Sequence, residues 1–207
     1  MKGPRHFIFS LLISVLIGFL HVEAAGNGII NTSTADFDMA VKAPVVSTKV
    51  SAAVARHMET IRQGFTSKNF KTSGFGNELV VLVTIPASQL FSPNGSELTY
   101  DRSRPLEYFH YALKHPEYYR LVVAVHADDT GDDDYSLGLT TKRVSAIKQV
   151  FDALVENDDV RPNVSYFALG NKRYLNSNST MNERAANRRV EIYIIPTAKV
   201  IDNIMAR

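Results

Sequence analysis

Aspartates gather in one short segment, 128-DDTGDDD-134, and an arginine lies a fixed distance beyond it. Asp128 directly follows the apolar run 120-RLVVAVHA-127, and Arg143 comes 15 residues later. A carboxylate and a guanidinium held close together can bind a zwitterion, because the first pairs with an ammonium and the second grips a carboxylate through its planar fork. The same two side chains could instead pair with each other and only tie the loop to the next element. Spacing alone leaves both interpretations open.

The element that must position Arg143 is a helix expected over residues 140–157, with Thr140 as its N-cap. Arg143 would then be the third helical residue, where a cation opposes the helix dipole. It is also in line with Ile147 on the apolar stripe, and a first-turn side chain leans toward the helix start. The guanidinium would therefore point at the loop that begins with Asp128. A residue that breaks a local rule without local compensation is a candidate for function.

The other elements alternate, which is typical of a two-layer α/β domain with α+β character. The run at 120–127 is apolar without alternation, as in a strand that is covered on both faces. The segment 73–77 contains glycines and is expected to be a turn, and Pro105 suits a first helical turn. We expect strands over 78–87, 120–127, 164–170 and 188–195, and helices over 47–65 (capped by Ser47 or Thr48), 105–115, 140–157 and about 181–187.

The first 24 residues have the pattern of a secretory signal peptide. Lys2 and Arg5 precede a 14-residue apolar run at 7–20, and Val22 and Ala24 supply small side chains for cleavage after Ala24. An uncleaved membrane anchor is the alternative, but a spanning helix needs about 20 apolar residues. We therefore expect a protein that is exported from the cytoplasm.

Four further segments follow the signal peptide. Residues 25–46 are small and polar without a sustained period and are expected to be a flexible lead-in. Residues 47–77 should form a helix and a connector, residues 78–196 the main domain, and residues 197–207 a tail that could add a short helix.

Composition excludes several classes of protein. The chain has no cysteine, so it has no disulfide, no thiolate zinc site and no acceptor for a lipid anchor. Removing the two cations and the one anion of residues 1–24 from a formal charge of +2 leaves +1. A nucleic-acid-binding protein would show a basic stripe and a strong positive excess, so we expect no nucleic-acid partner.

Two other uses of the acidic segment remain open. An enzyme would employ His126 with Asp128 or Asp129 as metal ligands or as a base and its orienting partner. However, the six histidines show no i, i+4 pair typical of a metal-binding helix, and no serine has the context of a nucleophile elbow. A calcium site would use the oxygen-rich segment, but the order of an EF-hand loop is missing. We expect no catalytic residues, no metal and no cofactor.

Three motifs in order carry a family resemblance. They are His126-x-Asp128-x-x-Gly131 with Tyr135, then Leu139-Thr140-x-x-Arg143, then 187-NRRVEI-192. Together they resemble the OmpA-like (OmpA C-terminal) peptidoglycan-binding domain, and 84-TIPASQLFSPNGSEL-98 is similar to its opening strand and LF segment. The similarity covers about residues 78–196. It implies a βαβαβ-type sandwich in which a mixed sheet has helices on one side.

The resemblance also implies a ligand and its contacts. In that family, the aspartate and the arginine of these motifs hold the free end of diaminopimelate in the peptidoglycan stem peptide, which assigns Asp128 and Arg143 as the ligand pair. Thr130, Gly131, Tyr135, Asn187 and Arg188 are supporting candidates. Strand alternation places Arg188 on the face of Val190 and Arg189 on the face of Glu191. We expect Arg188 to form a supporting ion pair with the loop, with direct ligand contact as the second choice.

The sequence departs from the family pattern at several positions. Val125 stands for Gly, Ala127 for Thr, Ser136 for Asn and Thr140 for Ser. Ala127 and Ser136 remove or shorten polar groups, so affinity or stem-peptide preference is expected to differ. The extra aspartates, Asp129 and Asp132 to Asp134, are expected to form a solvated rim, with Asp129 as a weak secondary contact.

The resemblance implies non-covalent binding of peptidoglycan, with an anchoring or structural role in a Gram-negative envelope and an association with the outer membrane. The alternative is a periplasmic scaffold that binds other envelope proteins, docked through the helix at 47–65, with peptidoglycan binding weak or lost.

Overall fold

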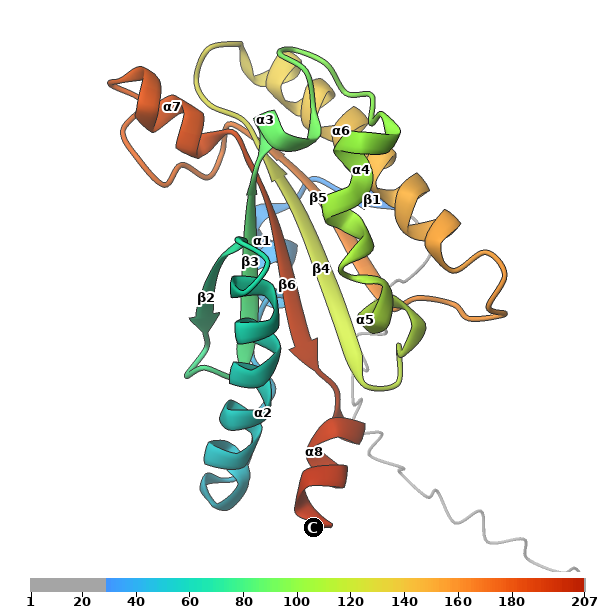
Figure 1. Cartoon of the computed structure of the whole chain (residues 1–207). Coiled ribbons are helices and arrows are strands. Elements are labelled where there is room, and N and C mark those ends of the chain that lie inside the picture. The colour runs from blue at the N-terminus through green and yellow to red at the C-terminus, as the bar shows by residue number, and fades with distance from the viewer. Residues whose placement is uncertain (1–28, 207) are drawn as a thin grey trace, which may run out of the picture.

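A six-stranded mixed sheet forms the centre of the computed structural model, which describes residues 29–206 (Figure 1). The strand order is β1-β5-β4-β6-β3-β2, with parallel pairing among β1, β5 and β4 and antiparallel pairing elsewhere. The strands are β1 Ile30–Asn31, β2 Lys71–Phe75, β3 Val80–Pro86, β4 Tyr119–His126, β5 Val164–Gly170 and β6 Arg189–Pro196. The predicted α/β class with a mixed sheet is confirmed. The expected signal peptide lies outside the described residues.

β4 is buried along its length, as its unbroken apolar run predicts. Leu121, Val123 and Val125 enter the core on one face of the sheet, whereas Val122 and Ala124 enter a second core on the other. Both faces are therefore covered, which explains why this strand shows no alternation of apolar and polar residues.

Six helices cover the first face of the sheet, where their apolar stripes meet β3, β4 and β6. In Figure 1, α2 and α4 lie in front of the sheet, whereas α7 extends beyond its upper end. The covering helices are α2 Thr48–Thr66, α3 Ala87–Leu90, α4 Tyr100–Glu107, α5 His110–Lys114, α6 Asp133–Leu154 and α8 Ala198–Met205. The helix beyond the sheet, α7, spans Met181–Asn187. α8 is the short helix that the tail was expected to add.

One more helix, α1 (Thr34–Ala40), covers the second face, behind the sheet in Figure 1. Its Phe37 packs edge-on against Phe167, with ring centroids 5.5 Å apart, and Arg120 donates a 2.6 Å hydrogen bond to the Ala40 carbonyl. The predicted flexible lead-in over 25–46 is thus wrong at β1 and α1, and helices are not confined to one side. A two-turn helix that buries a single large side chain leaves no sustained period to detect.

Two other segments differ from the predictions. The expected turn at 73–77 belongs largely to β2, an edge strand paired antiparallel with β3. The helix expected over 105–115 is two helices, and Pro105 lies inside α4 rather than in its first turn. In residues 29–206, no helix combines the length and apolar character that crossing a membrane requires.

Candidate functional site

The helix that carries Arg143 begins at Asp133, not near Thr140. Asp132 is the N-cap, because its carboxylate accepts a 2.7 Å hydrogen bond from the Tyr135 backbone N–H. Asp133 and Asp134 then occupy the first turn, where negative charge suits the helix dipole. The predicted conflict between Arg143 and the dipole is therefore wrong, since Arg143 lies in the middle of the helix. The extra aspartates build the helix start rather than only a solvated rim.

Thr140 joins α6 to the sheet instead of capping the helix. Its hydroxyl donates to the Ser136 carbonyl (2.9 Å) and accepts from the Gly170 N–H (3.1 Å) at the end of β5. Gly170 has a φ of +53°, and its carbonyl accepts from the Ala127 N–H at 2.7 Å. The ends of β4 and β5 and the body of α6 are thereby held together, which fixes the direction of Arg143 one turn further on.

Asp128, Arg143 and Arg188 line one pocket of about 500 Å³ just beyond the carboxyl end of β4. Its other walls come from the segment after β3, which includes Phe91, and from the first turns of α6. This position, outside the ends of buried strands, is a common place for ligands in α/β folds. The pocket brings together the two residues that the sequence analysis paired.

Arg143 is buried, with 4% of its surface exposed, yet it has no carboxylate partner within the described part of the chain. Its Nε donates a 2.8 Å hydrogen bond to the Gly95 carbonyl, and its guanidinium carbon lies 5.0 Å from the centroid of the Phe91 ring. Burial lowers the pKa of Arg143 from its ordinary value, although the group stays cationic near neutral pH. The guanidinium is oriented by neutral groups and lines the pocket without a carboxylate partner among the described residues.

Asp128 is equally buried, but both of its oxygens already accept hydrogen bonds. Oδ1 accepts from the Thr130 N–H at 3.2 Å, and Oδ2 accepts from Nη1 of Arg188. Burial alone would raise the pKa of Asp128, but the Thr130 hydrogen bonds and the Arg188 guanidinium outweigh it and hold the pKa below its ordinary value. The structure therefore pairs Asp128 with Arg188 and not with Arg143.

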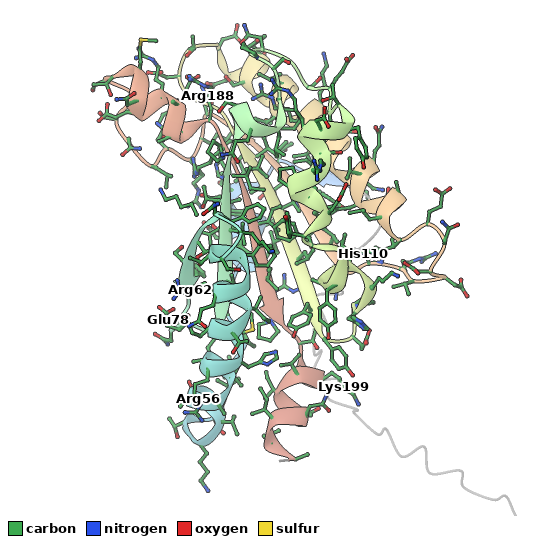
Figure 2. The ribbon with its side chains drawn as sticks, viewed as in Figure 1. Arg56, Arg62, Glu78, His110, Arg188 and Lys199 are labelled. Atoms are coloured by element: carbon green, nitrogen blue, oxygen red, sulfur yellow. The ribbon has the colours of Figure 1, made fainter. Side chains whose placement is uncertain are left out.

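The expected ion pair between Arg188 and the loop is thus present. Arg188 lies at the junction of α7 and β6, and Figure 2 shows it at the end of the sheet next to α7. Its side chain is 43% exposed, in contrast to the buried carboxylate that it contacts. This asymmetry lets the arginine move without opening the core.

Tyr135 and Asn187 have different places in the site. Tyr135 is half exposed and lines the pocket together with Thr130 and Gly131. A Cβ on Gly131 would lie 2.4 Å from Cδ1 of Tyr135, so the ring packs directly on the loop backbone. Asn187 does not line the pocket. It is buried, and its side chain makes four hydrogen bonds, with the Leu175 N–H, the Asn176 N–H and carbonyl, and Asn178 Oδ1.

Several residues in or next to the pocket were not predicted from the sequence. Phe91 and Gly95 orient Arg143, and Arg102 lines the same pocket while donating to the Ser88 carbonyl at 3.0 Å. The one feature of the sequence that indicated these residues was the similarity of 84–98 to the opening strand and LF segment of the family. Backbone carbonyl contacts such as that of Gly95 leave no trace in residue types.

His126 points away from the pocket, toward the second face of the sheet. Its Nε2 lies 3.2 Å from Oε2 of Glu191, so His126 contacts Glu191 and not Asp128. In the acidic segment, Asp132 caps α6, and Asp133 accepts a 2.7 Å hydrogen bond from the Asn171 side chain. In the part of the chain from 29 to 206, no three or more His, Asp or Glu side chains gather as metal ligands.

No protein-family model matches the sequence, and no curated protein sequence matches it. Solved structures do match. A protein described as MotB-like from Desulfovibrio vulgaris has a TM-score of 0.59 at 18% identity, over 72% of this chain and 98% of that chain. The cell wall anchor of the T6SS from Pseudomonas aeruginosa has a TM-score of 0.52 at 17% identity, over 70% of this chain and 97% of that chain.

A third match, with a TM-score of 0.42 at 16% identity, is the OmpA-like domain of FopA1 from Francisella tularensis, over 56% of this chain and 73% of that chain. At these identities the comparison concerns the fold alone, and the first two matches span almost the whole of each solved chain. The chain shares its fold with the first two solved structures, which agrees with the OmpA-like fold that its three motifs predict.

Proposed function

We propose that the protein is a cell-wall-binding module of the periplasm, which attaches non-covalently to peptidoglycan through the pocket of Asp128 and Arg143. One observation carries the proposal: Arg143 is buried and oriented by neutral groups while its charge faces the pocket unpaired within residues 29–206. A buried cation without a partner is costly, and an anionic ligand would remove that cost. The fold shared with a cell wall anchor supports the same function.

The ligand we propose is the free end of diaminopimelate in the stem peptide. Arg143 would hold its carboxylate, and Asp128 would accept its ammonium. Because Arg188 already contacts Oδ2 of Asp128, the ammonium has to share that carboxylate or displace the arginine. A single small zwitterionic end gives modest affinity, and many such ends within reach on the polymer would multiply it.

The test is co-sedimentation of the protein with purified sacculi of the diaminopimelate type. Arg143→Gln and Asp128→Asn each remove one partner of a charge-assisted contact, which should cost about 2 kcal/mol or more. That cost corresponds to a roughly 30-fold loss of affinity, enough to leave both variants in the supernatant. Circular dichroism establishes that each variant is folded.

Two matched controls remove the same charges outside the pocket. Lys142→Gln lies beside Arg143 on the exposed side of α6, and Asp134→Asn lies in its first turn. Both controls should pellet like the wild type. The proposal fails if the wild type stays in the supernatant, or if the folded pocket variants pellet as well as the controls.

A protein-interaction scaffold with weak or lost peptidoglycan binding is the second candidate. It is favoured by the ion pair between Arg188 and Asp128, which neutralises the buried carboxylate without any ligand. In that case the wild type would not pellet with sacculi, and the pocket variants would behave like the wild type.

A further inference from the structure

A second pocket, of about 680 Å³, lies on the first face of the sheet between the end of α2 and α4, and we call it the α2–α4 pocket. One wall is the connection from α2 to β2, with Lys68, Asn69 and Phe70. The opposite wall is α4 with the residue after it, Tyr108, and Gln89 of α3 closes the upper side. None of the residues discussed for the Asp128 pocket lines it.

An aromatic ring forms part of this surface. Tyr108 is 51% exposed, which is high for a large aromatic side chain. The ring is nonetheless held in place, because it packs on Phe70 with centroids 5.4 Å apart and an interplanar angle of 76°. Phe70 in turn packs on Phe65 at 5.6 Å. A ring that is supported from behind and open in front offers an apolar platform whose conformational entropy is already reduced.

Charges around the platform balance each other. Lys68 and Arg104 are cationic, Asp101 and Glu107 are anionic, and none of the four forms an ion pair within residues 29–206. Their hydrogen-bonding groups are available, yet the pocket favours neither sign of ion. The ligand that fits is neutral and rich in hydroxyl or amide groups, with an apolar face to stack on an aromatic ring. A pyranose ring of a glycan has these properties.

The two pockets lie on either side of α3 and α4, which are joined by the hydrogen bond from Arg102 to the Ser88 carbonyl. Ser88 and Arg102 line the Asp128 pocket, whereas their immediate neighbours in the chain, Gln89 and Asp101, line the α2–α4 pocket. We propose that the α2–α4 pocket binds the neutral glycan part of the same polymer whose stem peptide occupies the Asp128 pocket. This inference rests on the proposed function, because the stem peptide proposed for the Asp128 pocket is covalently attached to the glycan.

The test is an NMR titration of the protein with chitotetraose, a stem-free and neutral glycan that presents the acetamido pyranose rings of the polymer without a lactyl carboxylate. Wild type should show saturable shifts at Tyr108, Phe70 and Gln89. Tyr108→Ala removes the platform and should weaken glycan binding by about tenfold, whereas Tyr108→Phe keeps the ring and should retain most of it. Tyr111→Ala is the matched control, since Tyr111 is 61% exposed on α5 and lies outside the pocket.

The outcomes separate this inference from the proposed function. Glycan binding that survives Asp128→Asn and is lost in Tyr108→Ala supports the α2–α4 pocket, whatever the stem peptide does. Sacculus binding that depends on Asp128, without any shift from stem-free glycan, overturns the glycan site and leaves the stem site standing. Equal weakening by Tyr108→Ala and Tyr111→Ala also overturns it.

Discussion

At the scale of single residues, the site contains a buried carboxylate paired with a partly exposed cation. Asp128 is 5% exposed, whereas the Arg188 side chain is 43% exposed, so burial affects the carboxylate more than the guanidinium. A partly exposed ion pair contributes at most about 1 kcal/mol. Arg188 can therefore occupy the position on Asp128 that we propose for the ligand ammonium, and its displacement costs little free energy.

Arg188→Gln should raise the affinity for a stem peptide that ends in diaminopimelate by up to about fivefold, because the competitor for Asp128 is removed. Calorimetric titration with the soluble stem peptide measures this change. Arg102→Gln is the control, since it removes the same charge from the same pocket without touching Asp128. Weaker binding in Arg188→Gln would instead assign the arginine to the ligand.

At the scale of elements, α6 positions the site through one hydroxyl. Thr140 has no exposed surface and connects the helix to the last residue of β5. The family motif predicts Thr140 and Arg143 as members of the site, but the N-cap predicted at Thr140 is eight residues later than the observed N-cap, Asp132. The order of the motif was predictable. The contact with the Gly170 N–H was not, since it depends on how two elements 30 residues apart meet.

Thr140→Val, which keeps the volume but loses the hydroxyl, should lower the free energy of unfolding by about 1–3 kcal/mol, because the buried Gly170 N–H loses its acceptor. It should also weaken sacculus binding, because the part of α6 that carries Arg143 is no longer held to the end of β5. Thr141→Val is the matched control, because the Thr141 hydroxyl bonds only to the Leu137 carbonyl of the same helix. Urea unfolding and co-sedimentation measure both effects; equal losses in the two variants would contradict this role of Thr140.

At the scale of the whole molecule, the sheet separates the ligand pocket from a buried polar cluster under α1. Glu191 accepts from Arg189 at 2.7 Å and from the Tyr193 hydroxyl at 2.9 Å, and it lies 3.2 Å from His126. Strand alternation predicted that Arg189 and Glu191 share a face. The burial of that face was not predictable, because the helix that covers it carries only a weak sequence signal.

This cluster should make stability depend on pH. Burial alone would raise the pKa of Glu191, but the hydrogen bond with His126 and the Arg189 guanidinium lower it from 4.5 to about 2. A depressed folded-state pKa means that the stabilisation is complete above about pH 4.5 and is lost as the pH falls toward 2, on the order of 3 kcal/mol in total.

Glu191→Gln should therefore be much less stable than the wild type at pH 6, and the difference in the free energy of unfolding should shrink at pH 3. Urea titrations at both pH values measure it. Glu97→Gln, on the exposed loop before α4, is the matched control, because it makes the same substitution outside the cluster. A Glu191→Gln difference that stays constant between pH 6 and pH 3 would show that the carboxylate does not titrate as proposed.

The pairing of β1 has a consequence for the solution behaviour of the protein. Without β1, the seven-residue strand β5 would be an edge strand, and its apolar sequence would offer free N–H and C=O groups to any neighbouring chain. β1 pairs with Tyr166 and Phe167 in the middle of β5, and Phe37 of α1 packs on Phe167 from the second face. On a polymer such as the one we propose, many copies of the protein would lie close together, and this short strand would keep β5 from pairing with the sheet of a neighbouring copy.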